Sequence, residues 1–407
     1  MTRRGAPREE LPVHEVLLDA QDVAFRAEIR RFMTEALGPR AAAIEADEWS
    51  ATREALRTLG RAGYLRLMFP DHYRGSLTTP GLTHATMVSE EAARISYAFE
   101  TTVATALSCA FPLHRFAQPR PRERWLGPIL DGEGVGAICL TESRVGSDTS
   151  GMQTTIRFDP VSSEWVINGF KRYISNASVA DVYLVYGITD SSVPARKGMS
   201  AVLVPADAAN LSFPRRYHFM GRNGCVVGEV RLDDVRVPAD HLLGDLDGGF
   251  RIMLDMLNFE RTILGGSGLG VARSAFEIAV AHAQTRDVFG ERLAAKQLTW
   301  DKIAEMSWRI DAAELLTYRA AKLYDAGADN RALMKPAAMA KLVASETANL
   351  CADHTVQILG GDGLTREYGR AEQIYRDARA LTIVGGTTEV IKYLIASADL
   401  PLARPRL

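Results

Sequence analysis

The chain has 407 residues, 47% of them apolar and 24% charged, with 48 Lys and Arg against 50 Asp and Glu. This composition is typical of a globular protein with two or three domains. It argues against a concentrated basic surface, so we expect neither a nucleic-acid nor a membrane partner. The charged first ten residues do not resemble a secretory signal, and no apolar run approaches the ~20 residues of a membrane span.

The four cysteines are widely scattered and show no paired spacing: Cys109, Cys139, Cys225 and Cys351. The eight histidines are equally dispersed. This pattern favours reduced thiols over disulfides or a zinc site. We therefore expect a cytoplasmic protein without a metal centre.

The chain begins with helical patterns. Apolar residues recur at helical spacing over 19–37, and further helices are predicted near 52–59, 83–99 and 121–130. Gly and Pro separate these segments. We predict an N-terminal helical domain over residues 1–133.

The pattern changes at about residue 134, where short runs rich in Val, Ile and Tyr begin. These predicted strands lie at 136–140, 165–167, 182–187, 200–204 and 226–232. Turn residues separate them, as in an antiparallel sheet. We predict a middle β domain over residues 134–240.

Long helical periods return after residue 249, at 250–284, 297–326 and 331–359, with a shorter one after Thr387. Helices of this length predict a bundle over residues 241–407. The expected fold class is therefore α+β, with the sheet between two helical domains. The run GGSGLG at 265–270 does not match a nucleotide-binding loop and follows no strand, so close helix packing is the better interpretation.

Two motifs lie in the predicted β domain. TESRVGSD at 141–148 follows the first predicted strand, and its small residues would let backbone N–H groups approach a ligand. NGFKRYISN at 168–176 supplies an aromatic residue and hydroxyl donors. Taken separately, they could be a surface turn and a hairpin with an exposed aromatic side chain.

Three more motifs lie in the C-terminal third. They are RDVFGER at 286–292 with Gln297, QILGGDG at 357–363, and GGTTE at 385–389. Arg suits an anionic ligand because its planar fork can pair with two phosphate oxygens.

In their order and spacing, these motifs resemble those of the acyl-CoA dehydrogenase family of flavoproteins. The resemblance runs from about residue 19 to residue 396 and implies the α-β-α architecture, an FAD cofactor and an acyl thioester substrate. It also implies sites shared between subunits, hence a homodimer at least and usually a homotetramer.

The resemblance assigns cofactor-binding roles residue by residue. Leu140 and Thr141 would face the flavin ring, Ser147 would hold the pyrophosphate, Tyr173 would form an aromatic wall, and Ser175 would donate to N5. A second set would contact the dinucleotide, several of its members that of a neighbouring subunit: Arg286, Phe289, Gln297, Gln357, Gly360, Gly361, Thr387 and Glu389. Ser143, Tyr173 and Ser175 replace the commoner Pro, Trp and Thr.

The catalytic base is where this chain departs from most of the family. Most members carry it as the Glu of a Glu-Gly-Thr triplet, where this chain has Gly385-Gly386-Thr387. A minority, including isovaleryl-CoA dehydrogenases, place it on an earlier helix, at the position of Glu260. The segment LNFER at 257–261 resembles theirs, so we predict Glu260 as the base and Arg261 as a residue that orients the site.

The reaction explains why these residues matter. A carboxylate must remove the α proton in a dry site, where burial raises its pKa. The thioester carbonyl needs hydrogen-bond donors. In the family, one donor is the backbone N–H at the usual base position, and by this resemblance Gly385 keeps that N–H. Glycine at this position is also expected to leave room beside the β carbon, which would suit a branched chain.

Alternatives remain open at this stage. Glu260 could be an ordinary helix residue paired with Arg261 or a nearby Asp. The protein could dehydrogenate a short or branched acyl thioester of CoA or of a carrier protein, passing electrons to an electron-transferring flavoprotein. It could instead be a flavin oxidase or monooxygenase that uses oxygen, or a flavin-binding scaffold without catalysis.

Overall fold

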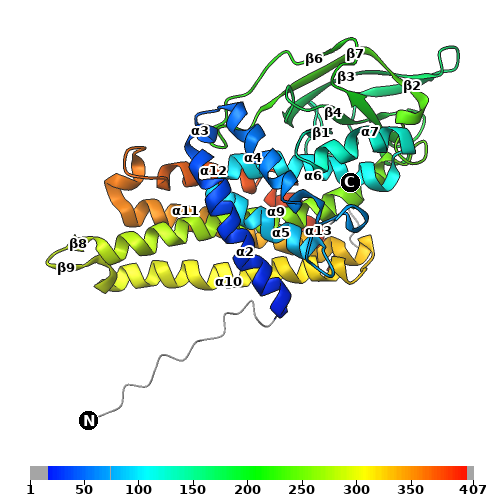
Figure 1. Cartoon of the computed structure of the whole chain (residues 1–407). Coiled ribbons are helices and arrows are strands. Elements are labelled where there is room, and N and C mark those ends of the chain that lie inside the picture. Colours follow the sequence, from blue (N-terminus) through cyan, green and yellow to red (C-terminus); the bar gives the residue numbers. More distant parts are fainter. Residues whose placement is uncertain (1–16, 74, 401–407) are drawn as a thin grey trace.

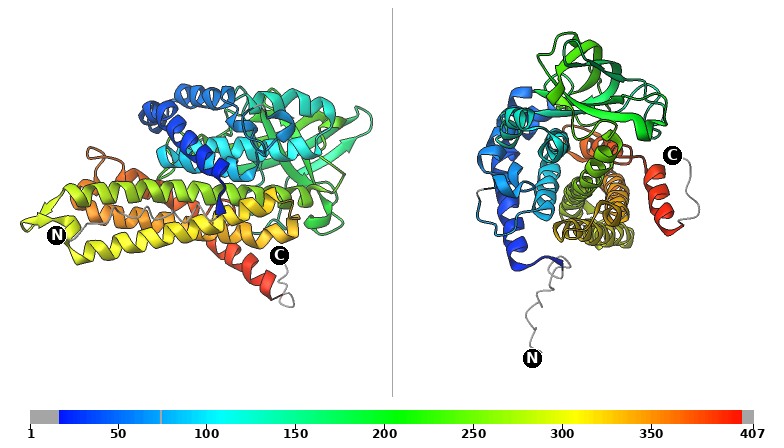
Figure 2. Two further views of the ribbon diagram at one scale, coloured as in Figure 1. Left: turned by 60° about the horizontal axis from the view of Figure 1, so that its bottom comes forward. Right: turned by 90° about the vertical axis from the view of Figure 1, so that its right-hand side faces the viewer.

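The computed structural model describes residues 17–73 and 75–400. In Figure 1, a group of N-terminal helices lies between a sheet at one end and a bundle of long helices that runs the length of the molecule. Figure 2 shows the long helices side by side, with the sheet beyond one end of the N-terminal helices.

The N-terminal part is helical, as predicted. Asp19 caps the N-terminus of the first helix through a capping box. Its carboxylate accepts from the Asp22 N–H at 2.9 Å, and the Asp22 carboxylate accepts from the Asp19 N–H at 3.0 Å. The elements are α2 (Ala20–Ala36), η1 (Gly38–Arg40), α3 (Ala41–Glu45), α4 (Trp49–Arg61), η2 (Tyr64–Arg66), η3 (Pro70–His72), α5 (Leu82–Ile95), α6 (Tyr97–Phe116) and α7 (Pro119–Leu130).

The prediction of one helix over 83–99 is wrong. Ser96 has an extended backbone, with φ −150° and ψ 106°, and ends α5. Its hydroxyl then accepts from the Phe99 N–H at 3.3 Å and caps α6. The break was hidden because both helices are buried on nearly all sides and show no change in apolar pattern.

The middle part is a curled sheet in the order β1-β4-β2-β3-β7-β6, with β5 beside β4. Its strands are β1 (Gly136–Cys139), β2 (Thr155–Asp159), β3 (Glu164–Ser175), β4 (Val182–Ile188), β5 (Met199–Pro205), β6 (Leu211–Ser212) and β7 (Val227–Pro238); α8 (Ala195–Gly198) and η4 (Ala239–His241) are short. Most pairs are antiparallel, as expected, but β4 runs parallel to β1 and β2. The motif at 168–176 is not a strand pair: residues up to Ser175 belong to β3, which is irregular between Lys171 and Ile174.

The C-terminal part is the predicted bundle. Its helices are α9 (Gly249–Thr285), α10 (Gln297–Asp325), α11 (Asn330–Leu359), α12 (Ala371–Leu381) and α13 (Thr388–Asp399), with the short elements β8 (Asp287–Val288), β9 (Glu291–Arg292), η5 (Leu293–Ala295) and η6 (Gly360–Leu364). The glycine run at 265–270 lies inside α9, where a Cβ on Gly268 would stand 2.8 Å from the Ala344 backbone and one on Gly270 only 2.1 Å from the Glu90 carbonyl oxygen. Close helix packing is therefore the correct interpretation of this run.

Helix α9 is long and apolar enough, by length and composition, to cross a membrane, which the sequence analysis did not anticipate. However, 72% of its most apolar window is buried inside the protein. This is the pattern of a central bundle helix, most of whose apolar surface is covered by neighbouring elements.

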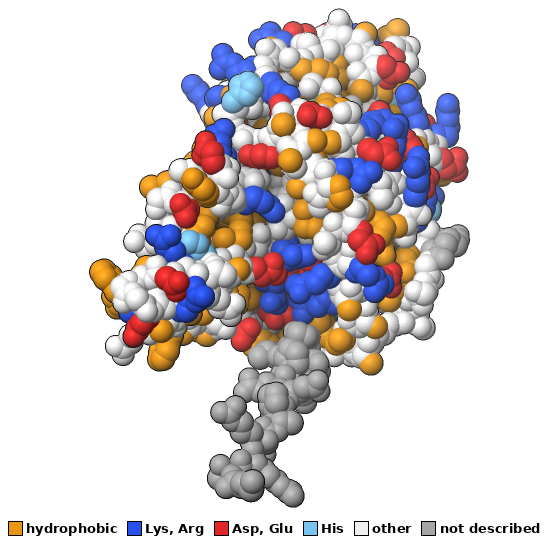
Figure 3. Space-filling view, turned by 60° about the vertical axis from the view of Figure 1, so that its left-hand side comes forward, with side chains coloured by type: hydrophobic (Ala, Val, Ile, Leu, Met, Phe, Trp, Pro, Cys, Tyr) orange, Lys and Arg blue, Asp and Glu red, His pale blue; other side chains and the backbone are white. Residues whose placement is uncertain are grey.

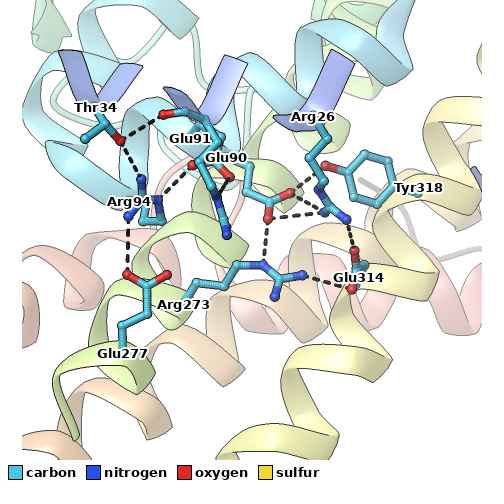
Figure 4. A network of polar contacts seen from close by, with 10 residues as sticks. Arg26, Thr34, Glu90, Glu91, Arg94, Arg273, Glu277, Glu314 and Tyr318 are labelled. Atoms are coloured by element: carbon cyan, nitrogen blue, oxygen red, sulfur yellow. Dashed lines mark hydrogen bonds and ion pairs between the residues drawn. The ribbon is translucent and has the colours of Figure 1, made fainter. Parts of the chain in front are cut away.

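A buried ionic network ties the N-terminal helices to the bundle (Figure 4). Glu90 of α5 accepts from Arg26 of α2 at 3.0 Å and from Arg273 of α9 at 2.7 Å. Glu314 of α10 pairs with the same two arginines, and the Tyr318 hydroxyl donates to Glu90. The network thus holds these four helices in one relative position.

Candidate active site

Glu260 lies in the first third of α9 and is half-buried. Burial raises the pKa of its carboxyl, and the nearby charges of Arg261 and Lys341 offset part of that rise. Within the described residues, Glu260 forms no ion pair closer than 4.0 Å. The interpretation of Glu260 as an ordinary paired helix residue is therefore wrong, and its carboxylate is free to accept a proton.

The loop between α12 and α13 lies against this part of α9. Arg261, which is buried, donates from Nε to the Gly385 carbonyl oxygen at 3.2 Å. Lys341 of α11, also buried, donates from Nζ to the next carbonyl, that of Gly386, at 2.6 Å. These two cations fix the orientation of the peptide groups on either side of Gly386.

This orientation leaves the Gly385 N–H available. Among the residues that the structure describes, no acceptor bonds to it, although the neighbouring N–H groups of Ile383 and Val384 both donate to the Ala380 carbonyl. A half-buried N–H without a partner is a ready donor for a ligand oxygen. Gly385 and Glu260 thus present a donor and a carboxylate from facing elements.

The space beside Gly385 is filled. A Cβ at this position would lie 2.4 Å from Cδ1 of Leu264, which is one helical turn beyond Glu260 on the same face of α9. The backbone also has φ +65°, where any side chain is strained. The prediction of open room beside the β carbon is therefore wrong, because Leu264 occupies that volume.

A second group of predicted residues meets at the ends of β1 and β3. The Arg172 N–H donates to the Thr141 carbonyl at 2.9 Å, and the Lys171 ammonium donates to the Leu140 carbonyl at 3.3 Å. Lys171 is fully buried and also pairs with Glu142 at 2.8 Å. The strand β3 thus holds the loop after β1 in place.

Tyr173 stands at the irregularity in β3, with φ +57° and 49% of its surface exposed. Its ring packs against Tyr217 at a centroid distance of 4.8 Å, and Phe219 lies beyond. Ser175 is half-buried two residues later, whereas Ser147 is exposed on the loop after β1. The aromatic surface and the hydroxyls fit a flat heteroaromatic ligand that carries a polar tail.

Comparisons with known proteins divide the chain into the same three parts as the fold. Family models described as the N-terminal, middle and C-terminal domains of acyl-CoA dehydrogenase match residues 19–133, 137–235 and 247–399. The probable acyl-CoA dehydrogenase YngJ of Bacillus subtilis is 33% identical over 380 residues, which cover 93% of this chain and 98% of YngJ.

The chain belongs to the acyl-CoA dehydrogenase family. Subunit CarC of the caffeyl-CoA reductase–Etf complex of Acetobacterium woodii is 34% identical over 347 residues, covering 84% of this chain and 89% of CarC. A crystal structure of a glutaryl-CoA dehydrogenase from Mycobacterium smegmatis in complex with FADH2 is 27% identical, with a TM-score of 0.84 over 96% of this chain and 97% of that one. The family resemblance and the fold class predicted from the sequence are confirmed.

Within one chain of this acyl-CoA dehydrogenase, the other predicted cofactor residues lie away from the loop that follows β1 and contains Thr141, called the Thr141 loop below. Arg286, Phe289 and Gln297 lie on or beside the β8–β9 hairpin, at the end of the bundle remote from the sheet (Figure 1). Gln357, Gly360 and Gly361 are exposed where α11 ends. Phe289 is 99% exposed, and Figure 3, which brings this side forward, shows apolar side chains at the surface of the bundle tip.

Thr387 and Glu389 form a third location. Thr387 caps α13 by accepting from the Val390 N–H at 3.4 Å, directly after the Gly385 loop, and Glu389 is exposed in the first turn. Both residues follow Gly385 within four positions in the chain, so they lie close to the site formed by Glu260, Arg261 and Gly385.

Sequence reasoning missed three residues of the site: Lys341, Leu264 and Lys171. Lys341 is a buried Lys in an Ala-rich helix, and a charge at an otherwise apolar position was a signal that could have been used. Leu264 carried no signal, because leucine in a helix is ordinary core. No group of three or more His, Cys, Asp or Glu side chains among residues 17–73 and 75–400 is arranged to hold a metal.

Proposed function

We propose that this protein is an FAD-dependent dehydrogenase of short acyl-CoA thioesters and that Glu260 removes the α proton. Two groups carry the proposal: the Glu260 carboxyl, whose pKa is raised, and the backbone N–H of Gly385. Neither has an ion-pair or hydrogen-bond partner among the residues that the structure describes. A base must reach the α carbon while a donor stabilises charge on the adjacent carbonyl, and these two groups provide both.

Each residue of the site has its own role in the proposed reaction. Glu260 takes the proton, and burial makes its carboxylate a stronger base than an exposed one. The Gly385 N–H donates to the thioester oxygen, and Arg261 keeps that peptide group in place through its bond to the Gly385 carbonyl. Lys341 holds the following carbonyl, and its positive charge favours the ionised form of Glu260.

The cofactor proposal rests on the Thr141 loop and β3. Tyr173 offers an aromatic wall, and Thr141 and Ser175 offer hydroxyls beside it. When bound, FAD supplies the ring that accepts the hydride from the β carbon. The chain's own part is to position that ring and to exclude water.

Oligomeric state and electron acceptor are part of the proposal. The predicted dinucleotide residues lie in separated groups, which supports a homodimer or homotetramer in which one subunit completes the site of another. The name of CarC refers to an Etf complex, so we propose an electron-transferring flavoprotein as the acceptor rather than oxygen. Four buried, unpaired cysteines support a reducing compartment such as the cytoplasm.

The test is anaerobic flavin reduction by a panel of short acyl-CoA and acyl-carrier-protein thioesters. Glu260→Gln should bind FAD as the wild type does but lose flavin reduction by at least about 100-fold, since proton transfer by a placed base contributes about that much. Glu277→Gln, an exposed carboxylate further along α9, is the matched control and should keep its rate. Full activity of Glu260→Gln would refute the assignment, and rapid reoxidation of the reduced protein by oxygen would favour an oxidase.

A further inference from the structure

A second buried carboxyl, Glu100 of α6, lies close enough to Glu260 for the two charges to interact. It is only 1% exposed, yet it forms no ion pair within 4.0 Å in the described part of the chain. The hydroxyls of Ser89 and Ser267 both donate to its Oε1, at 2.6 and 2.7 Å. Its other oxygen, Oε2, has no hydrogen-bond partner among the described residues.

The position of Glu100 relative to Glu260 follows from α9. Ser267 comes seven residues after Glu260, so the two lie on the same face of the helix, about 10 Å apart along its axis. Leu264 lies between them on that face. Through Ser267, the Glu100 carboxyl is thus joined to the face of α9 that carries Glu260.

Arg222 provides the second unpaired group. This arginine, in the loop between β6 and β7, is 6% exposed, and its Nε has no hydrogen-bond partner in the part of the chain that the structure describes. Its backbone has φ +59° and is held by the bond from its N–H to Asp377. The charge of Arg222 acts on Glu100 and lowers the pKa of that carboxyl, which burial raises to about 7 overall.

The flavin-side strand borders the same region. The thiol of Cys225, three residues after Arg222, interacts with Ser175 and with Thr102 of α6. Asn176 donates to the Thr102 carbonyl at 3.2 Å. The loop that carries Arg222 and Cys225 therefore lies beside both α6 and the end of β3.

A hydrocarbon acyl tail does not match the polar side chains of Glu100 and Arg222. An unpaired carboxyl oxygen and an unpaired guanidinium N–H are both costly when buried, and an apolar chain would leave both unsatisfied. A cationic tail would be attracted by Glu100 but repelled by Arg222, and an anionic tail would be attracted by Arg222 but repelled by Glu260 and ionised Glu100. A neutral group that both donates and accepts satisfies both atoms.

We propose that Glu100 and Arg222 form the acyl-tail end of the substrate site and select an acyl thioester whose tail carries a hydroxyl, or another neutral group that donates and accepts hydrogen bonds. The tail hydroxyl donates to Glu100 Oε2 and accepts from Arg222 Nε–H. This inference rests on the proposed function and specifies its substrate class.

The test compares matched substrates on the FAD-loaded enzyme. Each ω-hydroxyacyl-CoA is paired with the acyl-CoA in which a methyl replaces the hydroxyl, and ω-amino and ω-carboxy thioesters of equal length complete the panel. We expect kcat/KM to favour the hydroxyl member of one pair by at least about 10-fold, because a polar pocket rejects an analogue that leaves it unpaired. Equal or better use of the methyl-terminated member at every length, or preference for a charged tail, would overturn the proposal.

Two variants test the residues separately. Glu100→Leu should reverse the preference, whereas Glu100→Gln, which keeps an acceptor oxygen, should retain it. Arg222→Met removes the donor from another element and should also reduce the preference, so the proposal stays testable if Glu100→Leu fails to bind FAD. Unchanged preference in Arg222→Met and Glu100→Leu would refute it.

The outcomes also separate this inference from the proposed function. If methyl-terminated thioesters reduce the flavin and the hydroxyl gives no advantage, only the tail assignment fails. If no thioester in the panel reduces the flavin, the proposed function itself fails and the tail assignment falls with it.

Discussion

The glycine at 385 offers a sharp test, because its side chain is excluded for two independent reasons. Gly385→Ala introduces a Cβ at φ +65°, which costs about 1–2 kcal/mol in the left-handed region. The same Cβ overlaps Leu264 Cδ1 at 2.4 Å, and moving that packed side chain costs a further 1–3 kcal/mol, roughly. The expected loss in free energy of unfolding is therefore about 2–5 kcal/mol.

A control separates the two contributions. Gly327 has φ +81° and nothing within 4 Å of its would-be Cβ, so Gly327→Ala should lose only the backbone part, about 1–2 kcal/mol. In a Leu264→Ala background, Gly385→Ala should also fall to about that value, because the overlap is gone.

The assay is denaturant unfolding of the four variants, with midpoints compared at equal m-values. The reasoning is refuted if Gly385→Ala loses no more stability than Gly327→Ala. It is equally refuted if the Leu264→Ala background leaves the cost of Gly385→Ala unchanged.

Two further predictions concern charge. Glu260 acts when ionised and its pKa is raised, so kcat/KM of the wild type should rise with pH through a pKa above the ordinary value of a glutamate. Lys341→Met should move that rise to higher pH, because the Lys341 charge lowers the Glu260 pKa. A shift of the kcat/KM profile to lower pH would contradict this. Glu90→Gln should destabilise the fold by about 3–5 kcal/mol by leaving buried arginines without their anion. The folded pKa of Glu90 is lowered to about 2, so its contribution is complete above pH 4.5 and is lost as the pH falls towards 2. Acid unfolding of the wild type and Glu90→Gln measures this, and an equal effect of Glu277→Gln, at an exposed ion pair, would contradict it.

Much of the architecture could be predicted because apolar periodicity is a local property. The ranges predicted for the long bundle helices match α9, α10 and α11 closely, since each repeats its pattern over many turns. Where local pattern is uniform, prediction failed: the break at Ser96 lies between two helices buried nearly all round. The parallel pairing of β4 with β1 also depends on a partner distant in sequence.

The candidate site was only partly predictable, for the same reason. A carboxylate at 260 and its absence at 385 are visible in the sequence, and so are the motifs that place the chain in its family. Neither the bond from Arg261 to the Gly385 carbonyl nor the position of Lys341 is visible there, because each joins segments far apart in the chain.

By itself, the sequence determined the family, the order of helical and β domains, and the two positions at which a base can stand. Only the tertiary structure decided what surrounds those positions. Among residues 17–73 and 75–400, Glu260 forms no ion pair and nothing accepts from the Gly385 N–H, and Leu264 fills the space where a side chain at 385 would lie. The physical reason is that composition and periodicity are fixed along the chain, whereas desolvation, packing and pairing depend on which distant segments meet.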